Sequence, residues 1–330
     1  MNTCKRSLSG IKPTGNIHLG NYIGAVQGFL NLQAQKDINN FYFIADYHAL
    51  NSIPDPKALR QLTLDMFKSL IALGLDTDIS TIFIQSDVPE HTELCWLLTS
   101  LTPVGLMERA HAYKDIIAHE KNPNMGLLSY PILQAADILI YDPHFVPVGA
   151  DQKQHIEITR DLAEKFNRIY GDTFVVPEPL IQESVAIIPG TNGEKMSKSK
   201  NNTIDIFRSE KEIKKQVMSI TTDSTPLEEA KEFNTCAVYN IYKFLATPTE
   251  LTEMQANYKN GNYGYGHAKI RLYEKILEYF GEARRNLQEL NNNEDEVYKL
   301  IKKGAFKAQE YARPKINQVR KAVGLGELNA

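Results

Sequence analysis

Two short segments, far apart in the chain, carry residue types suited to binding phosphate. In the first, residues 8–25, a turn at Gly15 joins an apolar run to a helical pattern. A helix that begins at Gly20 presents free N–H groups and the positive end of its dipole to an anion. His18 and Asn21 flank that glycine with further hydrogen-bond donors. An ordinary strand-to-helix turn has much the same composition, so this segment alone does not decide between the two interpretations.

The second segment is the lysine-rich loop 193–202. Its hydroxyl residues Ser197 and Ser199 are interleaved with Lys195 and Lys198. Flexible lysines can close on a polyphosphate while its charge shifts during a reaction, and then release it. An exposed basic linker is the alternative for a loop of this composition.

A helical pattern over residues 126–141 supplies a third functional group. Tyr130, Gln134 and Asp137 are spaced i, i+4 and i+7, which places them on one helix face beside two alanines. Burying an acid in an apolar stretch is costly unless the acid has partners, so we favour a functional Asp137 over a local cap or ion pair. This helix face is therefore predicted to line a pocket.

These groups need a sheet whose strands end at one edge. Strand and helix patterns alternate over residues 5–101, which predicts a parallel sheet with helices on both faces and ligands at the carboxyl ends of the strands. The expected strands are 5–11, 41–49 and 81–86, and the expected helices are 21–36, 56–73 and 91–101. Further along, we expect a mobile loop over 105–122, a helix over 126–141, an apolar run at 145–148, a helix from 151 to 168 and a short apolar run at 185–188.

Beyond residue 204 the strand patterns end and helical periodicity dominates. The expected helices are 210–221, 237–246, 248–257, 266–290 and 294–323, with Asn291–Asn293 as a linker. The fold class is therefore α/β, a doubly wound, Rossmann-like parallel sheet with a C-terminal all-helical domain. We expect one domain over 1–205, with a helical insertion around 105–170, and a helical domain over 206–330.

Composition excludes several classes of protein. A net charge of −3 gives no overall attraction to nucleic acid. No apolar run approaches the ~20 residues needed to span a bilayer, and the first residues lack a signal peptide's apolar core, so we expect a cytoplasmic protein without membrane contact. Three scattered cysteines and eight histidines without ligand spacing predict no disulfide framework and no metal site. The basic run 299–321 is a candidate nucleic-acid contact, with a solvated helix face as the default interpretation.

The sequences of the two loops resemble the signature motifs of class I aminoacyl-tRNA synthetases. These are Pro-Thr-Gly-Asn-Ile-His-Leu-Gly-Asn at 13–21 and Lys-Met-Ser-Lys-Ser at 195–199. Segments 128–141 and 146–161 resemble tryptophanyl-tRNA synthetases of the bacterial and organellar type. The resemblance implies a ligase, acting as a homodimer with Mg²⁺, that activates L-tryptophan with ATP to tryptophanyl-AMP and pyrophosphate. It then implies transfer of tryptophan to the 3′-terminal adenosine of tRNA(Trp), with the anticodon read by the helical domain.

The resemblance also implies roles for individual residues. The implied catalytic residues are His18, Asn21, Lys195 and Lys198. The implied ATP-binding residues are Ser9, Lys12, His18, Gly20, Asn21, Gly149, Asp151, Lys195, Met196, Ser197, Lys198 and Ser199. The implied tryptophan-binding residues are Leu8, His48, Tyr130, Gln134, Asp137, Val146, Val148 and Gln152, with Tyr130 and Gln152 at the α-amino group. An indole has one donor and no acceptor, so an ionised Asp137 suits it. For His48, a buried core histidine is an equally good interpretation.

The chain departs from the family pattern at two positions that bear on binding. Relatives often have an aromatic residue at the position of Leu8, so the pocket wall is expected to be looser. The loop that contains Lys114 has Ile116 where a second lysine is usual, and Lys121 is a candidate replacement. Two other functions fit the residues less well. A tyrosine-specific enzyme would need a further hydroxyl near Asp137, and the intact loop motifs disfavour a silent paralogue that binds tRNA or tryptophan as a regulator.

Overall fold

A parallel five-stranded sheet forms the centre of the protein. The structure, a computed structural model, describes residues 4–110, 113, 124–149, 152–181 and 188–326. The strand order β3-β2-β1-β4-β5 is that of a doubly wound α/β fold, which confirms the predicted fold class. The strands are β1 (Lys5–Ile11), β2 (Ile38–Ile44), β3 (Thr81–Ile84), β4 (Phe145–Val148) and β5 (Glu178–Ile181). Strands β1 and β2 pair in parallel along their whole length.

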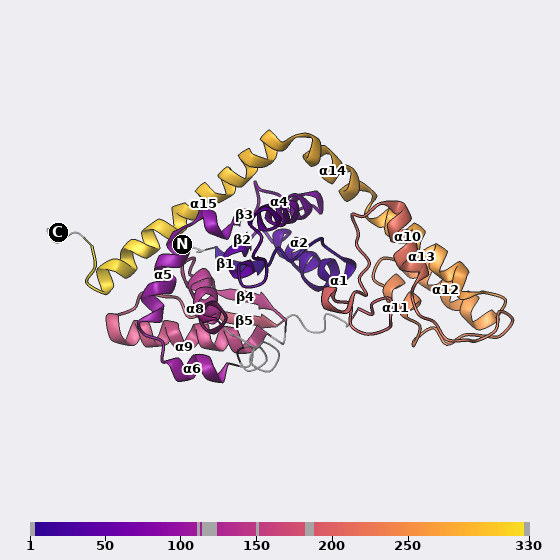
Figure 1. Ribbon diagram of the computed structural model, residues 1–330, viewed down its shortest axis with the longest axis horizontal. Helices are drawn as coiled ribbons and strands as arrows, with labels where there is room; N and C mark the ends of the chain where they lie inside the picture. The colour runs from indigo at the N-terminus through magenta and orange to yellow at the C-terminus, as the bar shows by residue number, and fades with distance from the viewer. Residues whose placement is uncertain (1–3, 111–112, 114–123, 150–151, 182–187, 327–330) are drawn as a thin grey trace.

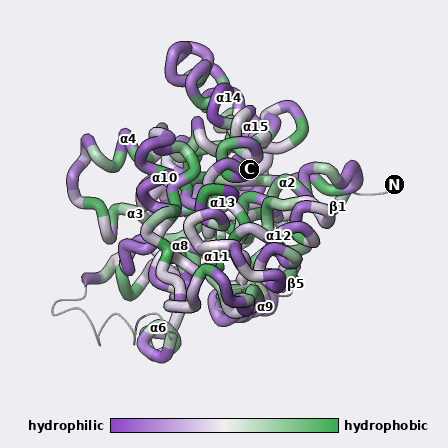
Figure 2. The backbone as a smooth tube through the Cα atoms, turned by 90° about the vertical axis from the view of Figure 1, so that its right-hand side faces the viewer, coloured by the Kyte–Doolittle hydropathy of each residue, from purple (hydrophilic) through white to green (hydrophobic). Residues whose placement is uncertain are grey.

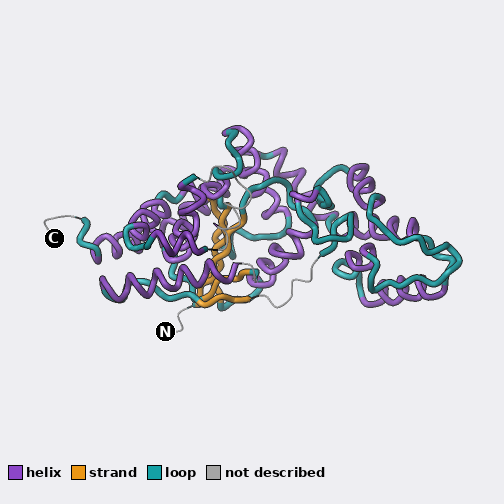
Figure 3. The backbone as a smooth tube through the Cα atoms, turned by 60° about the horizontal axis from the view of Figure 1, so that its bottom comes forward, coloured by secondary structure: helices purple, strands orange, loops and turns teal. Residues whose placement is uncertain are grey.

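Helices cover both faces of the sheet because its central strands are apolar on both sides (Figure 3). In β2, Tyr42 and Ile44 belong to one hydrophobic core, and Phe41 and Phe43 belong to the other. The first core includes α2 (Gln27–Gln33) and α4 (Pro56–Ala72). The second core includes α5 (Glu90–Thr99), α8 (Met125–Leu139) and α9 (Lys153–Tyr170). Shorter helices are α1 (Leu19–Asn21), α3 (Asp46–Ala49) and α6 (Val104–Arg109).

The C-terminal part of the chain is helical, and its first four helices lie away from the sheet (Figure 1). Its helices are α10 (Glu210–Met218), α11 (Ala237–Tyr242), α12 (Pro248–Asn260), α13 (Tyr265–Tyr279), α14 (Gly281–Asn292) and α15 (Glu294–Ala322). Figure 2 shows α14 as largely hydrophilic, and none of its residues is buried. In the described part of the chain, no helix is long and apolar enough to cross a membrane.

The last helix, α15, turns back and crosses the edge of the sheet at β3 (Figure 1). Gly304 brings the helix so close that an added Cβ would lie 1.7 Å from the carbonyl oxygen of Ile82. The basic run predicted to be a solvated face or a nucleic-acid contact is largely paired within the chain. Its intramolecular contacts are Lys303 with Asp78, Lys307 with the carbonyl of Thr77, Arg313 with Glu90, Lys315 with Asp142, and Arg320 with Glu93. These side chains fasten α15 to α5 and to the segments just before β3 and β4.

Some elements differ from the sequence prediction for identifiable reasons. The strand expected over 41–49 ends at Ile44, because the Asp46 carboxylate accepts the backbone N–H groups of Tyr47 and Ser86 and starts a helical turn. The helix expected over 21–36 is interrupted by a π-helical turn at Tyr22–Val26. Strand β5 was not predicted, and the run at 185–188 lies largely outside the described residues.

Two C-terminal predictions were also imprecise. The single helix expected over 266–290 is divided at Phe280, whose buried ring packs on Tyr22. The expected linker is shorter than three residues, because α14 continues to Asn292 and α15 begins at Glu294. The division into domains at 205 stays a prediction, and the first hydrophobic core continues from α4 into the C-terminal helices.

Candidate functional site

A cavity of about 450 Å³ opens at the carboxyl ends of β1 and β4, where a doubly wound sheet binds ligands. Its wall includes all eight residues predicted to bind tryptophan: Leu8, His48, Tyr130, Gln134, Asp137, Val146, Val148 and Gln152. Of the predicted ATP-binding residues, Ser9, Lys12 and Gly149 also line it. The same cavity is therefore lined both by the predicted tryptophan-binding residues and by residues at the start of the first loop motif.

Asp137 is the charged group at the base of this cavity. It is 0% exposed, and both of its oxygens accept hydrogen bonds. Oδ1 accepts from Gln85 Nε2 and His91 Nδ1, each at 2.7 Å, and Oδ2 lies 2.9 Å from His48 Nε2. Burial alone raises the pKa of this acid, but the hydrogen bonds from His48 and His91 lower it to about 2. Asp137 is therefore an ionised acceptor at neutral pH.

The structure places His48 between a buried carboxylate and the cavity, and its role in binding stays a prediction. The residue lies on α3 rather than at a strand end, and its Nε2 contacts Asp137 while its ring lines the cavity. Gln85 and His91 were not predicted from the sequence. Gln85 directly follows β3 at the carboxyl edge of the sheet, and this position was the available signal. For His91 the sequence offered none.

Tyr130 and Gln152 are connected through His155, a buried residue of α9. Tyr130 Oη lies 2.9 Å from His155 Nε2, and His155 Nδ1 lies 2.9 Å from Gln152 Oε1. The His48 ring meets the Tyr130 ring edge-on, with 6.2 Å between centroids. One polar network thus covers the cavity wall where a substrate amino group is predicted.

The apolar wall has an aromatic ring despite Leu8. Leu8 is 1% exposed, and the Phe43 ring from the neighbouring strand lines the cavity. Gly10, paired with Phe43 across the strands, makes room for this ring, since an added Cβ would lie 2.4 Å from Phe43 Cζ. Phe43 therefore supplies an aromatic ring to the wall although position 8 is a leucine.

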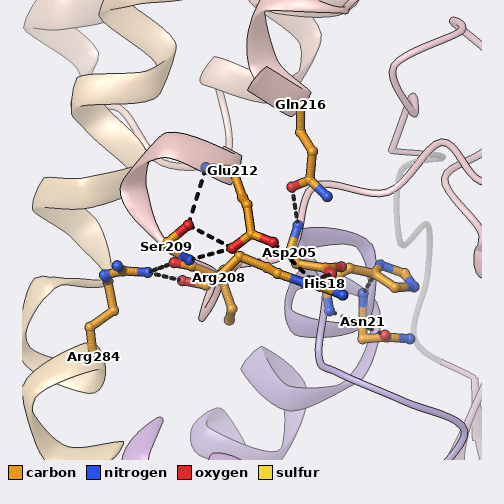
Figure 4. Close-up of polar contacts among 9 residues, drawn as sticks. His18, Asn21, Asp205, Arg208, Ser209, Glu212, Gln216 and Arg284 are labelled. Carbon is orange, nitrogen blue, oxygen red and sulfur yellow. Dashed lines mark hydrogen bonds and ion pairs between the residues drawn. The ribbon is translucent and has the colours of Figure 1, made fainter. Parts of the chain in front are cut away.

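His18 and Asn21 cap the first turn of α1 reciprocally (Figure 4). His18 Nδ1 accepts the backbone N–H of Asn21 at 3.2 Å, and Asn21 Oδ1 accepts that of His18 at 3.4 Å. Burial, together with the nearby Lys198, lowers the pKa of His18 to about 4. The imidazole is thus neutral at pH 7. Because Nδ1 accepts, the ring proton lies on Nε2, which can donate to a phosphate oxygen.

The structure brings the two loop motifs together. Leu19 N–H donates to the Ile204 carbonyl at 2.9 Å, and Gly20 N–H to Met196 Sδ at 3.3 Å. Gly15 has φ +125°, and an added Cβ there would lie 3.3 Å from Lys198 Nζ. The half-buried Lys198 ammonium therefore lies over the first loop, and desolvation lowers its pKa.

The second loop is held in shape by Asn202, which is 1% exposed. Its Oδ1 accepts the Ser197 N–H at 2.8 Å, and its Nδ2 donates to Asn192 Oδ1 at 2.6 Å and to the Lys195 carbonyl at 3.1 Å. Just beyond, Arg208 pairs with Asp205, and Arg284 of α14 donates to the backbone carbonyls of Ile206 and Arg208 (Figure 4). The loop is thereby tied to the helical part of the chain.

Most of the remaining predicted ATP-binding residues do not line the cavity. Lys195, Met196, Ser197, Lys198 and Ser199 belong to the second loop and do not line the cavity. Ser9 Oγ is buried without a hydrogen-bond partner among the described residues, and burial lowers the pKa of Lys12. Asp151, Lys114, Ile116 and Lys121 lie outside the described residues.

Comparison with known proteins identifies the family. Residues 3–281 match the family described as tRNA synthetases class I (W and Y), which is the class that the parallel sheet and the two loops define. The chain is 53% identical over 324 residues to a tryptophan–tRNA ligase of Fusobacterium nucleatum, covering 97% of this chain and 98% of that protein. It is 45% identical over 320 residues to a tryptophan–tRNA ligase of Rhodopirellula baltica, covering 97% and 99%.

A solved structure gives the same result. Tryptophanyl-tRNA synthetase from Campylobacter jejuni, in complex with ADP and tryptophan, superposes with a TM-score of 0.93 at 44% identity. The alignment covers 97% of this chain and all of that one. The chain belongs to the tryptophan–tRNA ligase family, as its motifs predicted.

Proposed function

We propose that this cavity binds L-tryptophan and that Asp137 accepts the indole N–H. The enzyme then activates tryptophan with ATP to tryptophanyl-AMP and pyrophosphate, and transfers the tryptophanyl group to the 3′-terminal adenosine of tRNA(Trp). The observation that carries the amino-acid specificity is a fully buried, ionised carboxylate at the base of an aromatic-sized cavity.

The hydrogen bonds around Asp137 support recognition of a donor. Oδ1 already accepts two hydrogen bonds, whereas Oδ2 accepts one, from His48. An ionised carboxylate has about four acceptor positions, so Oδ2 retains capacity for one N–H. It has no proton to give, and a ligand group that must also accept a hydrogen bond is not satisfied there. An indole, which donates and never accepts, meets this requirement better than a phenol.

Activation requires positioning and charge stabilisation more than acid–base catalysis. The tryptophan carboxylate is ionised at neutral pH and attacks the α-phosphorus of ATP, releasing pyrophosphate. We propose that His18 Nε2–H and the N–H groups near Gly20 and Asn21 contact the triphosphate, and that Lys195 and Lys198 neutralise the leaving pyrophosphate. Ser9, Lys12, Gly149 and Asp151 complete the proposed nucleotide site.

Mg²⁺ is proposed to arrive with ATP. Among the described residues, no group of three or more His, Cys, Asp or Glu is arranged to hold a metal ion. Mg²⁺ is commonly bound through substrate phosphates with few protein ligands, so such a site fits the residues present. When bound there, the ion supplies positive charge to the phosphate oxygens.

The remaining partners are proposed from the family. We propose that the helical part after residue 205 binds the tRNA anticodon, that the enzyme acts as a homodimer and that it is cytoplasmic. Lys302 is exposed on α15 and forms no ion pair within the described chain, so it is available to a phosphate. Lys303 instead pairs with Asp78.

The test is Asp137→Asn, which keeps the side-chain volume and removes the charge. We expect the tryptophan KM in ATP–pyrophosphate exchange to rise roughly 10- to 100-fold, because a hydrogen bond to a charged partner is lost. Discrimination against phenylalanine and tyrosine should fall as well, while the KM for ATP should change little.

Asp142→Asn is the matched control. Asp142 lies just past the end of α8, pairs with Lys315 and does not line the cavity. Its φ of 46° is one that asparagine tolerates. This variant should keep the wild-type KM for tryptophan. Unchanged discrimination among aromatic amino acids in Asp137→Asn would refute the assignment.

A further inference from the structure

His91 is a buried histidine whose two ring nitrogens both contact polar side chains. Nδ1 lies 2.7 Å from Asp137 Oδ1, and Nε2 lies 2.8 Å from Tyr141 Oη. His91 is 0% exposed, Tyr141 is 1% exposed, and neither residue lines the cavity. The three residues form a chain of hydrogen bonds that runs from the cavity base into the core.

The surroundings of these hydrogen bonds determine which group donates in each. Burial raises the pKa of Tyr141 well above its usual value, as do the charges of Asp137 and Glu90, so the hydroxyl keeps its proton. The ionised Asp137 can only accept, so His91 Nδ1–H donates to Oδ1, and Nε2 is left to accept the Tyr141 O–H. Tyr141 therefore stabilises the tautomer that Asp137 needs.

Aromatic packing holds the His91 ring in place. The rings of Phe43, Phe83 and Tyr141 surround it, with centroids 6.1, 5.9 and 5.4 Å from the imidazole centroid. Tyr141 is itself stacked on Phe41, which lies against Tyr311 of α15. This aromatic packing leaves the His91 imidazole little freedom to turn away from Asp137.

We propose that His91, oriented by Tyr141, is a positioning residue that keeps Asp137 an ionised, correctly directed acceptor and thereby sets selectivity for a side chain with a ring N–H. The inference rests on the proposed function of Asp137. In an apolar core a carboxylate that loses one of its donors takes up a proton more readily, even though Gln85 and His48 still donate to Asp137. A protonated Asp137 would become a hydrogen-bond donor itself, and its preference for an indole N–H would fall.

The probe is the tryptophan analogue in which sulfur replaces the indole N–H, benzothiophenyl-alanine. Its kcat/KM in ATP–pyrophosphate exchange is compared with that of tryptophan. Wild-type enzyme should favour tryptophan by at least about tenfold, the effect of one hydrogen bond to a charged group. A wild-type enzyme without this preference would overturn the proposed function of Asp137 itself.

Three variants test the positioning role. His91→Leu removes both hydrogen bonds and should reduce the preference for tryptophan over the analogue by about tenfold. His91→Asn keeps an N–H near the Nδ1 position and should restore most of that preference. Tyr141→Phe removes the tautomer-stabilising hydroxyl and should cause an intermediate loss. In each case the loss should come from a raised KM for tryptophan, with the analogue much less affected.

The control is Tyr258→Phe, which removes another fully buried hydroxyl, next to Cys236 in the helical part. It should leave the preference at the wild-type value. If the wild-type enzyme prefers tryptophan and His91→Leu weakens tryptophan and the analogue equally, His91 supports the fold alone and the inference is wrong. Equal preference in His91→Leu and His91→Asn would also contradict it.

Discussion

Replacing Gly304 with alanine tests whether the packing of α15 on β3 helps to hold the residues around Asp137 in place. The helix crosses β3 at this glycine, and β3 leads directly into Gln85. An added Cβ would lie 1.7 Å from the carbonyl oxygen of Ile82 and 2.8 Å from its carbonyl carbon. Both atoms belong to the backbone of a paired strand, so the helix must move away.

The cost can be estimated from two opposing effects. Overpacking against a rigid neighbour typically destabilises by about 1–3 kcal/mol, and a backbone contact this short belongs at the upper end. Alanine is a better helix former than glycine by about 1 kcal/mol. We therefore expect the free energy of unfolding to fall by about 2 kcal/mol.

Urea unfolding of Gly304→Ala, compared with Gly266→Ala, provides the measurement. Gly266 lies in α13, and an added Cβ there would meet no atom within 4 Å, so its replacement should be neutral or slightly stabilising. The tryptophan KM should rise in Gly304→Ala, because Gln85 moves with β3, and should not rise in Gly266→Ala. Equal stability of the two variants would refute the close packing of α15 on the sheet.

Three further predictions concern the two loops and the basic helix. The pKa of His18 is lower in the folded chain, about 4 against 6.5, so stability present at pH 7 is lost as the pH falls towards 4. Between pH 7 and pH 4.5 this loss is about 2 kcal/mol, and urea unfolding at the two pH values should show a smaller loss in His18→Asn; equal losses would contradict the shift. Asn202→Ala should loosen the second loop and raise the KM for ATP about tenfold in pyrophosphate exchange, because three hydrogen bonds are lost. Lys302→Glu should weaken tRNA charging, most at low salt, without slowing exchange, and unaffected charging would exclude this surface from tRNA binding.

Most of the sheet, and the face of α8 that lines the cavity, could be predicted from the sequence because these features are local. The apolar run of β4 and the 3.6-residue spacing of Tyr130, Gln134 and Asp137 can be read within one window. The residue at which β2 ends could not be predicted from the local sequence. The apolar run continues beyond Ile44, and the turn depends on Asp46 accepting the N–H of Ser86, 40 residues away.

The network around Asp137 illustrates the same limit. Its donors His48, Gln85 and His91 come from three elements and lie 89, 52 and 46 residues from it in the sequence. Sequence patterns place each element in the sheet but do not show which side chains meet. The contact between Phe43 and Gly10 is similar, because it depends on the register of two paired strands.

The central claim is that a buried carboxylate selects tryptophan for activation by ATP. Amino-acid-dependent ATP–pyrophosphate exchange, run with each of the twenty amino acids, tests it most directly. Tryptophan should support exchange with a kcat/KM several orders of magnitude above any other, since a site built to pair a substrate N–H rejects side chains lacking it by about 10⁴–10⁵. Exchange with tyrosine as fast as with tryptophan, or faster, would contradict the account.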